Sequence, residues 1–263
     1  MIALTANGSF ASAYQAIDTS EIVSSRQLTK EEFTAKLSKA KVVIHNASSL
    51  NCPDLYTAVQ NNFEFTKHLV DILQSTNPDV HLVFLSSMSI LDSMNENKYA
   101  DVLAMSPYAY SKYLAETYCL KSDLRYLSCV RFSTLFYKDP RKDGLSKLIS
   151  DATLNKKISL INKGEAARDF LPLNVAVNYI KKIVSQKPDG HRVYTLASGE
   201  PRRFEQIANI LKAQLPDLEI DTVRQEDTPR ILSEFQTHDI DELGRIPFDL
   251  EAEITDFIKE LGT

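Results

Sequence analysis

The chain has 263 residues, of which 43% are hydrophobic and 25% are charged, and its formal net charge is −5. This composition is that of an ordinary globular protein, and it excludes collagen-like, low-complexity and disordered chains. A mildly acidic chain also lacks the concentrated basic surface that general nucleic-acid binding requires. Only 7 residues are glycine, which leaves little material for a glycine-rich phosphate loop.

The three cysteines, Cys52, Cys119 and Cys129, have no close paired spacing, so we expect neither a disulfide framework nor a metal site. The histidines are scattered, and His45 is interpreted as structural. The first residues lack the basic region and apolar core of a signal peptide. No apolar run approaches the roughly 20 residues that span a bilayer. We therefore expect a cytoplasmic protein that binds neither membranes nor nucleic acid.

Short apolar runs alternate with segments of helical periodicity up to Phe132. The predicted strands are Ile2–Thr5, Ile22–Val23, Val42–Ile44, His81–Leu85 and Tyr126–Phe132, and the predicted helices are Phe10–Ile17, a helix from Thr29, Asp54–Gln74 and Pro107–Leu120. Thr29 and Glu32 have the spacing of a capping box, and Pro107 suits the first position of a helix. This alternation predicts βαβ units and a parallel sheet that is covered on both faces.

The pattern changes after Phe132, where Asp139–Gly144 is rich in turn residues. Helices are predicted at Leu145–Leu154, Phe204–Leu215 and Leu250–Leu261, and short strands at Arg168–Leu173 and Val193–Leu196. We expect an α/β fold, a Rossmann-type doubly wound parallel sheet with a smaller C-terminal α/β lobe. Residues 1–135, completed by 165–200, would form the first domain, and residues 136–164 and 201–263 the lobe. Ligands are expected in the cleft between them.

The most informative segment is Ser106–Glu116, SPYAYSKYLAE, in which Tyr108 and Lys112 are four residues apart and share one helix face. A tyrosine titrates near pH 10, and a neighbouring ammonium lowers that pKa, so Tyr108 is a candidate acid or base. Ser86-Ser87 ends a predicted strand, where ligands sit in parallel sheets, and offers a hydroxyl. The alternative is an ordinary amphipathic helix with Tyr108 and Lys112 on its surface.

These residues resemble the motifs of the extended short-chain dehydrogenase/reductases, specifically the NAD(P)-dependent epimerase/dehydratase family, which acts on nucleotide sugars. Other similar segments are Lys41–Ala47 (the family's fourth strand), Asn62–Thr66, Val83–Ser87, Ala167–Phe170, Tyr194–Gly199, Val223–Asp227 and Leu243–Leu250. The resemblance implies a dinucleotide-binding first domain and a substrate-binding lobe. It also implies that the catalytic set is Ser87 (rather than Ser86), Tyr108 and Lys112, with Lys112 on the cofactor ribose and Asn46 and Ala47 beside the cofactor.

The first turn departs from the family's Thr-Gly-x-x-Gly-x-x-Gly pattern. The chain reads Thr5-Ala6-Asn7-Gly8-Ser9-Phe10-Ala11-Ser12, so Ala6, Ser9 and Ser12 occupy the glycine positions. Glycines there permit a tight turn and close approach of the backbone to the pyrophosphate. Small residues keep part of that room, and helix N-terminal amides bind phosphate. We therefore expect the cofactor to contact Thr5, Asn7, Gly8, Ser9 and Phe10, with weak or lost binding as the alternative.

A second departure concerns the reaction. Ser87 is followed by Met88-Ser89, where the family's dehydratases carry an acid and a base, which argues against a 4,6-dehydratase. We expect hydride transfer that reduces a nucleotide-linked 4-keto-6-deoxy sugar in polysaccharide biosynthesis, with Ser87 and Met88 touching the substrate. A reductase exchanges its cofactor at every turnover, which suits a weakened turn. The alternatives are a nucleotide-sugar 4-epimerase and, in another class, a catalytically impaired binding or regulatory subunit.

Arginines supply the remaining predictions. Arg26 follows the second predicted strand, where an acidic residue would favour NAD and an arginine accommodates the 2′-phosphate of NADP, so NADP(H) is favoured over NAD(H). Arg168 and Arg224 are candidates for the substrate diphosphate, which suits bidentate arginine contacts, although each is alternatively a surface ion-pair residue. The resemblance further implies a homodimer formed through the helix Pro107–Leu120.

Overall fold

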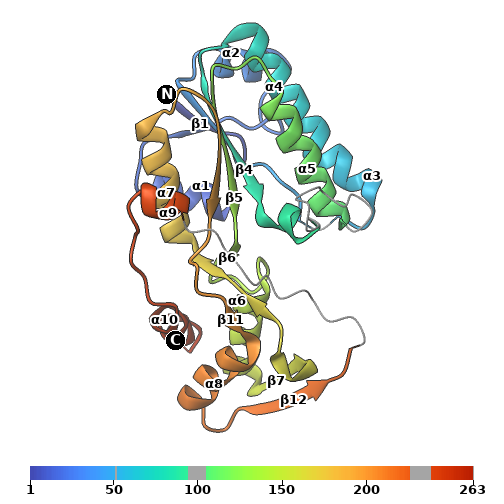
Figure 1. Cartoon of the computed structure of the whole chain (residues 1–263), viewed down its shortest axis with the longest axis vertical. Coiled ribbons are helices and arrows are strands. Elements are labelled where there is room, and N and C mark those ends of the chain that lie inside the picture. The colour runs from blue at the N-terminus through green and yellow to red at the C-terminus, as the bar shows by residue number, and fades with distance from the viewer. Residues whose placement is uncertain (51, 94–104, 226–237, 263) are drawn as a thin grey trace. The chain divides into compact units, whose positions relative to one another are not determined.

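The computed structural model describes residues 1–50, 52–93, 105–225 and 238–262, and the chain divides into two compact units (Figure 1). Unit 1 comprises Met1–Phe132 and Val177–Leu196, and unit 2 comprises Ser133–Ala176 and Ala197–Thr263. The expected completion of the first domain by residues 165–200 is therefore too long at its start. Residues 165–176 belong to unit 2, because both short strands of that segment pair with strands of unit 2.

A six-stranded parallel sheet forms the centre of unit 1. Its order is β10 (Gly190–Leu196), β5 (Tyr126–Phe132), β4 (His81–Ser87), β3 (Val42–His45), β1 (Ile2–Leu4) and β2 (Glu21–Ile22). Near-continuous apolar runs form these strands because both faces of the sheet are covered. The strand order reverses between β1 and β3, so the turn after β1 lies beside the end of β3. The prediction of a doubly wound parallel sheet is confirmed.

The segment Lys41–Ala47, which resembles the family's fourth strand, contains β3. This strand pairs with β1 on the side away from β2, which is the place of the fourth strand in the Rossmann order. The Rossmann order 3-2-1-4-5-6 has a further strand beyond the second, and the part of the chain that the structure describes has none there. Helix α2 (Lys30–Leu37) instead leads from β2 to β3, and its predicted capping box of Thr29 and Glu32 is present.

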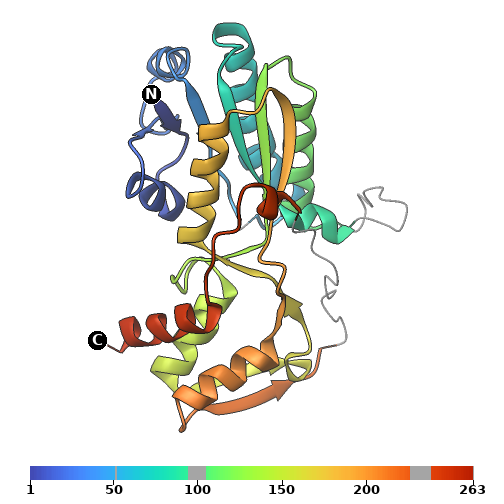
Figure 2. The ribbon, with the colours of Figure 1, turned by 60° about the vertical axis from the view of Figure 1, so that its left-hand side comes forward.

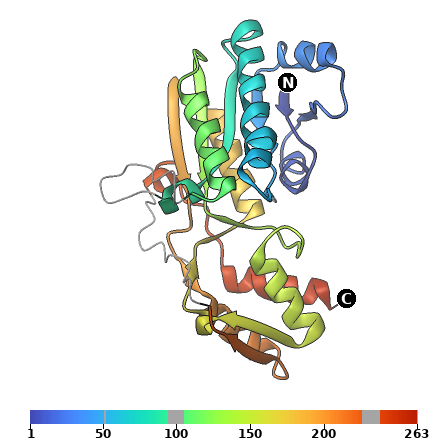
Figure 3. The same cartoon turned by 90° about the vertical axis from the view of Figure 1, so that its right-hand side faces the viewer.

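Helices cover both faces of the sheet (Figures 2 and 3). One face carries α2, α4 (Phe65–Thr76) and α5 (Pro107–Leu120), whose apolar side chains share a core with β5. The other face carries α1 (Ser9–Gln15) and the part of α7 (Leu173–Gln186) that belongs to unit 1. Lys181 of α7 donates to the carbonyl of Ile17, just after α1, over 2.7 Å. No helix among the described residues is both long and apolar enough to cross a membrane.

The helix predicted over Asp54–Gln74 is interrupted. It begins as α3 (Leu55–Ala58), which Asp54 caps by accepting from the backbone N–H of Thr57, and passes through a π-helical turn, Val59–Glu64, into α4. Hydrophobic periodicity cannot distinguish such a turn from a regular helix. The turn contains the buried side chain of Asn62, which bonds to the loop after β3 and to Ser111 of α5.

Unit 2 has its own hydrophobic core. Its described residues form three two-stranded ribbons and the helices α6, α8, α9 and α10: β6 (Thr134–Phe136) with β9 (Phe170–Pro172), β8 (Ala167–Arg168) with β11 (Arg202–Arg203), β7 (Lys157–Ile161) with β12 (Glu219–Val223), and α6 (Gly144–Ser150), α8 (Phe204–Gln214), α9 (His238–Glu242) and α10 (Leu250–Leu261). Gly164, with φ +79°, approaches α8 so closely that an added Cβ would lie 2.6 Å from the backbone nitrogen of Glu205.

Candidate active site

A serine and a tyrosine meet at the carboxyl end of β4. The strand ends at Ser87, and α5 begins with Pro107 after its N-cap Ser106, whose Oγ accepts from the backbone N–H of Ala109 over 3.2 Å. The first turn of α5 carries Tyr108, and its phenol hydrogen-bonds to the side chains of Ser87 and Ser48. The structure thus brings together two of the three predicted catalytic residues and adds a second hydroxyl, that of Ser48.

Ser86, which precedes Ser87, has different hydrogen-bond partners. Ser86 is buried, and its Oγ donates to Glu116 Oε2 over 2.6 Å. The same carboxylate accepts from Arg131 Nε, at 3.0 and 3.1 Å to its two oxygens. Ser87 instead accepts hydrogen bonds from Ser89, at 3.2 Å from its backbone N–H and 2.9 Å from its hydroxyl. Ser87 is therefore the serine of this pair that reaches the tyrosine.

Lys112 lies one helical turn beyond Tyr108 and is only 2% exposed. Its ammonium donates to the carbonyl oxygen of Leu85 over 2.6 Å and lies 4.5 Å from the ring centroid of Phe84. Burial lowers the pKa of Lys112 to about 8, and the charge of Glu116 opposes this shift. The lysine is thus a buried cation bound to the backbone of β4.

The expected lowering of the Tyr108 pKa by Lys112 is wrong for this structure. Burial raises the pKa of the phenol, while its hydrogen bonds to Ser48 and Ser87 act in the opposite direction. Lys112 is not among the groups that shift the pKa of this phenol, and its ammonium is bound to the carbonyl of Leu85. A raised pKa keeps Tyr108 protonated at neutral pH, so the side chain is an acid ready to donate.

Asn62, in the π-helical turn, holds the loop that carries Ser48. Asn62 is 2% exposed; its Oδ1 accepts from the backbone N–H of Ser49 over 2.7 Å, and its Nδ2 donates to the Ser49 carbonyl over 3.0 Å. The same Nδ2 donates to Ser111 Oγ over 2.9 Å, and Ser111 donates to the Tyr108 carbonyl over 2.8 Å. One buried amide therefore ties the Ser48 loop to the helix of the tyrosine.

The predicted cofactor residues Thr5, Asn7, Gly8, Ser9 and Phe10 form the turn after β1 and the start of α1. Gly8 is the N-cap, no side chain caps the helix, and a Cβ at Gly8 would meet nothing within 4 Å. The space beside Gly8 is open, which leaves room there for an approaching pyrophosphate. The side chain of Phe10 is buried, with its ring centroid 6.5 Å from that of Phe132, so only its backbone is available to a cofactor.

Asn46 and Ala47, the other residues expected beside the cofactor, follow β3. The Asn46 amide bonds to the backbone of Ala6: Oδ1 accepts from its N–H and Nδ2 donates to its carbonyl, both over 2.9 Å. The backbone N–H of Ala47 donates to Thr5 Oγ1 over 3.3 Å. The end of β3 thereby holds the turn after β1.

His45 connects this turn to α4. Its Nδ1 lies 2.8 Å from Thr5 Oγ1 and its Nε2 lies 2.8 Å from Thr66 Oγ1. The Thr66 hydroxyl donates to the Asn62 carbonyl over 2.6 Å, so it accepts from His45, which places the ring proton on Nε2. Burial lowers the pKa of His45 to about 3, so the ring is neutral. Each group therefore donates to the next, from the Ala47 N–H through Thr5, His45 and Thr66 to the Asn62 carbonyl.

Arg26 lies in the exposed turn after β2. Its backbone N–H donates to Ser24 Oγ over 3.3 Å, and no described side chain pairs with its guanidinium. This position, past the end of the second strand, is the one that the NADP prediction requires.

The predicted substrate arginines both lie in unit 2. Arg168 ends β8, and its Nη1 donates to the carbonyl of Ala167 over 2.9 Å. The adjacent Asp169 is 1% exposed, and its carboxylate accepts from Ser198 N, Ser198 Oγ and Gly199 N over 2.8, 2.6 and 2.8 Å. Asp169 therefore connects two of the segments that resemble the family, Ala167–Phe170 and Tyr194–Gly199. These bonds also hold the chain next to Arg168 in place.

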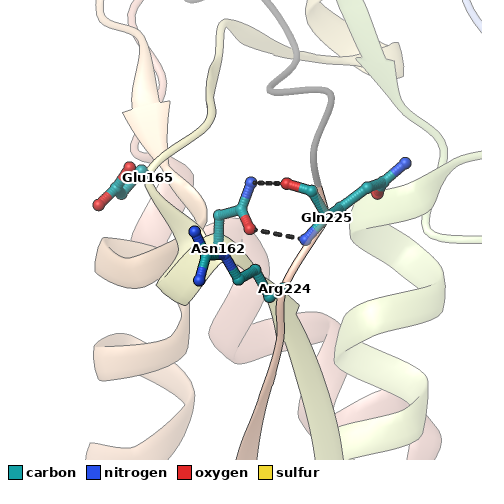
Figure 4. Close-up of a pocket in the computed structure, with 4 residues that line it drawn as sticks. All are labelled: Asn162, Glu165, Arg224 and Gln225. Atoms are coloured by element: carbon teal, nitrogen blue, oxygen red, sulfur yellow. Dashed lines mark hydrogen bonds between the residues drawn. The ribbon is translucent and has the colours of Figure 1, made fainter.

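Arg224 lies at an open pocket of about 860 Å³ (Figure 4). The described residues that line it are Asn162, Glu165, Arg224 and Gln225. Asn162 Nδ2 donates to the Gln225 carbonyl and the Gln225 N–H donates to Asn162 Oδ1, both over 2.8 Å, which fixes the chain beside Arg224. Arg168 is not among these lining residues. The last two residues of the similar segment, 226 and 227, lie outside the described residues.

A parallel sheet of this order, with a polar group at the carboxyl end of β4 and an open turn after β1, is the architecture of Rossmann-type dinucleotide-binding proteins. Residues 2–197 match the NAD dependent epimerase/dehydratase family, and the chain belongs to it. Members of this family are NAD(P)-dependent enzymes that modify nucleotide sugars. Among curated proteins, none matches the chain significantly.

Solved structures share the fold over nearly their whole length. The NAD-dependent NDP-hexosamine 5,6-dehydratase TunA, of tunicamycin biosynthesis, has a TM-score of 0.81 at 17% identity over 98% of this chain and 96% of its own. RMD from Pseudomonas aeruginosa, complexed with NADPH, gives 0.79 at 16% over 99% and 98%. UDP-glucose 4-epimerase from Thermotoga maritima, with UDP-glucose, gives 0.79 at 16% over 98% and 98%. At these identities the likeness concerns the fold.

Proposed function

We propose that the chain is an NADP(H)-preferring oxidoreductase that reduces a nucleotide-linked 4-keto-6-deoxy sugar. The observation that carries the proposal is the hydrogen-bonded pair of Ser87 and Tyr108, with Lys112 buried one turn further along α5. Support comes from family membership and from neighbours of the same fold, which include an NADPH complex and enzymes of nucleotide sugars.

Each catalytic residue has a separate role in the proposed reduction. When bound, NADP(H) supplies the hydride that reduces the sugar carbonyl. Tyr108 donates its phenolic proton to the carbonyl oxygen, and Ser87 hydrogen-bonds to the same oxygen. Lys112, one helical turn further along α5, would offer a donor to the cofactor ribose. The hydroxyl of Ser48, which also bonds to the phenol, is exposed, so it would pass a proton from solvent to the tyrosine after each turnover.

The raised pKa of Tyr108 favours a reductase over the 4-epimerase. Reduction begins with a proton donor, which the protonated phenol provides at neutral pH. An epimerase must first remove a proton from the sugar hydroxyl, which requires the phenolate. The residues Met88 and Ser89, which follow Ser87, supply neither the acid nor the base of a dehydratase.

The proposal includes specific contacts to the cofactor and to the substrate. The backbone from Asn7 to Phe10 would hold the pyrophosphate, and Arg26 the 2′-phosphate. In unit 2, Arg168 and Arg224 would bind the substrate diphosphate through bidentate contacts. Met88 is 5% exposed, so it would contact the sugar only by its edge.

The test combines binding with turnover. Wild-type protein is titrated calorimetrically with NADPH and NADH, and NADPH consumption is followed with a set of nucleotide-linked keto sugars. Tyr108→Phe is expected to lower turnover by about 100-fold or more while leaving folding and NADPH binding intact. Tyr113→Phe removes a phenol from the same helix and serves as the matched control, with unchanged turnover.

Other outcomes identify the alternatives. Cofactor that co-purifies, with product formed without net NADPH consumption, would indicate the 4-epimerase. Protein that binds neither dinucleotide would contradict both enzymes and leave the binding or regulatory subunit, which the replacement of the family's glycines by Ala6, Ser9 and Ser12 favours.

We also propose that the chain forms a homodimer through the face of α5 and its neighbour α3. Two large apolar side chains on α3 are exposed, Leu55 at 48% and Tyr56 at 75%. Burial of such side chains against a second copy would stabilise the assembly.

A further inference from the structure

The first turn of unit 1 lacks the glycine that the family pattern has at position 6, yet the turn is held in place. Ala6 occupies the position, and Asn46 bonds to its backbone. We propose that Asn46 is a positioning residue that substitutes for this glycine: it holds the turn in the form that receives the cofactor phosphates and thereby sets dinucleotide affinity. This inference rests on the proposed function.

The geometry resembles an added piece of β-ladder. The last backbone bond between β1 and β3 runs from Thr5 N–H to the Ile44 carbonyl, over 3.2 Å. Beyond it, the Asn46 side chain bonds to both the N–H and the carbonyl of Ala6. One residue that exchanges both its polar groups with one partner is the pattern of paired strands. The amide of Asn46 therefore extends the pairing past the end of β3.

Few side chains other than asparagine can make this pair of bonds. An aspartate accepts but cannot donate, an alanine does neither, and a glutamine is longer by one methylene group. Both bonds go to backbone atoms, so they hold the turn whatever side chain stands at position 6. The chain then continues into Asn7 and Gly8, which are exposed, and into the open start of α1.

The same arrangement changes the role expected for Asn46 itself. Its two polar atoms are engaged with Ala6, and the polar groups of Ala6 are engaged with Asn46. Asn46 therefore acts on the cofactor through the turn, and phosphate contacts fall to the backbone that follows Ala6. Loss of the bonds between Asn46 and Ala6 is expected to loosen the turn and, as a consequence, to lower the affinity for the dinucleotide.

Unit 1 contains a matched control. Asn77 is also partly buried, and its Nδ2 donates to two backbone carbonyls, those of Leu37 and Ala40, over 3.1 and 2.8 Å. These bonds lie in the connections before β3 and β4, at the opposite end of the strands from the site. Asn77→Ala removes a comparable set of bonds without touching the turn.

The experiment measures three quantities in wild type, Asn46→Ala, Asn46→Asp and Asn77→Ala. They are the Kd of NADPH, the hydrogen exchange of the amide of Ala6 in cofactor-free protein, and the thermal midpoint. Asn46→Ala is expected to raise the Kd about tenfold or more and to speed exchange at Ala6. The KM for NADPH should rise while kcat at saturating cofactor stays within about twofold.

The two other variants sharpen the result. Asn77→Ala should lower the thermal midpoint by a similar amount and leave both the Kd and the exchange at Ala6 unchanged. Asn46→Asp keeps the acceptor for the Ala6 N–H, so it should retain part of the protection from exchange.

Two outcomes overturn the inference separately from the proposed function. Equal Kd values for Asn46→Ala and Asn77→Ala, in a chain that binds NADPH, would contradict the role of Asn46 alone. Unchanged exchange at Ala6 in Asn46→Ala would do the same. Failure of the proposed function is recognised in the wild type, which would bind neither dinucleotide, and the role of Asn46 in affinity falls with it.

Discussion

At the scale of single residues, spacing predicted which side chains approach one another. It did not predict the pKa values of those side chains in the folded chain. The position of Ser87 at the end of a strand and of Tyr108 at the start of a helix could be predicted because both lie at the ends of regular elements. Ser48 could not, because it comes from an irregular loop whose placement depends on the buried side chain of Asn62. The pKa of Tyr108 also depends on burial and on its contact with Ser48, neither of which the spacing predicts.

The buried lysine predicts a pH dependence of stability. The pKa of Lys112 is about 8 in the folded chain and 10.5 when the lysine is unperturbed, because burial disfavours the charged form. Between these values the unfolded chain binds more protons, so the free energy of unfolding rises with pH, by up to about 1.4 kcal/mol per unit. Below about pH 8 the unfavourable contribution of Lys112 is present in full.

Lys112→Met removes this contribution. Its stability relative to wild type is therefore expected to be greatest near about pH 7 and to decline towards about pH 10, as measured by urea unfolding at several pH values. The carbonyl of Leu85 loses its partner in the variant, which adds an offset that does not vary with pH. Lys121→Met, at an exposed position directly after the same helix, should show a constant difference. A constant difference for Lys112→Met would refute the assignment.

At the scale of elements, some regular helices and buried strands could be predicted from the sequence, and other elements were missed. Helix α5 and strand β5 follow their predicted bounds. Helix α7 was not predicted, although its buried residues Val175, Tyr179, Ile180 and Ile183 recur at helical spacing. The ribbon of β7 and β12 was missed because each strand is short and their pairing joins residues far apart in sequence.

The attachment of α5 to β5 yields a prediction at this scale. Glu116 is 5% exposed and pairs with Arg131, which is 23% exposed. Arg131→Met leaves a buried carboxylate whose remaining hydrogen-bond partner among the described residues is Ser86, so it should lower the free energy of unfolding by about 3–5 kcal/mol in denaturant titrations. The double variant Glu116→Leu with Arg131→Met should recover most of that loss. Lys147→Met, which breaks the exposed pair with Asp151, should change stability by less than about 1 kcal/mol. A loss in the double variant as large as in Arg131→Met would contradict this account.

At the scale of the whole molecule, the fold class and the division into a sheet domain and a smaller unit could be predicted from the order of the elements. The boundary could not, because strands of two or three residues in segment 165–176 pair with strands of unit 2, and nothing local in the sequence selects their partner. The number of subunits also lies beyond the reach of sequence patterns, since it depends on which exposed side chains find a partner.

The proposed homodimer is tested at two exposed apolar sites. Tyr56→Asp, on α3 beside α5, is expected to convert the dimer into a monomer, because a charge in a buried apolar interface costs several kcal/mol when it is unpaired. Leu154→Asp places the same charge at a side chain that is 60% exposed in unit 2 and should leave the dimer intact. Sedimentation velocity at several protein concentrations distinguishes these outcomes. Wild-type protein that sediments as a monomer, or a dimer that dissociates only in Leu154→Asp, would show that α3 and α5 do not form the interface.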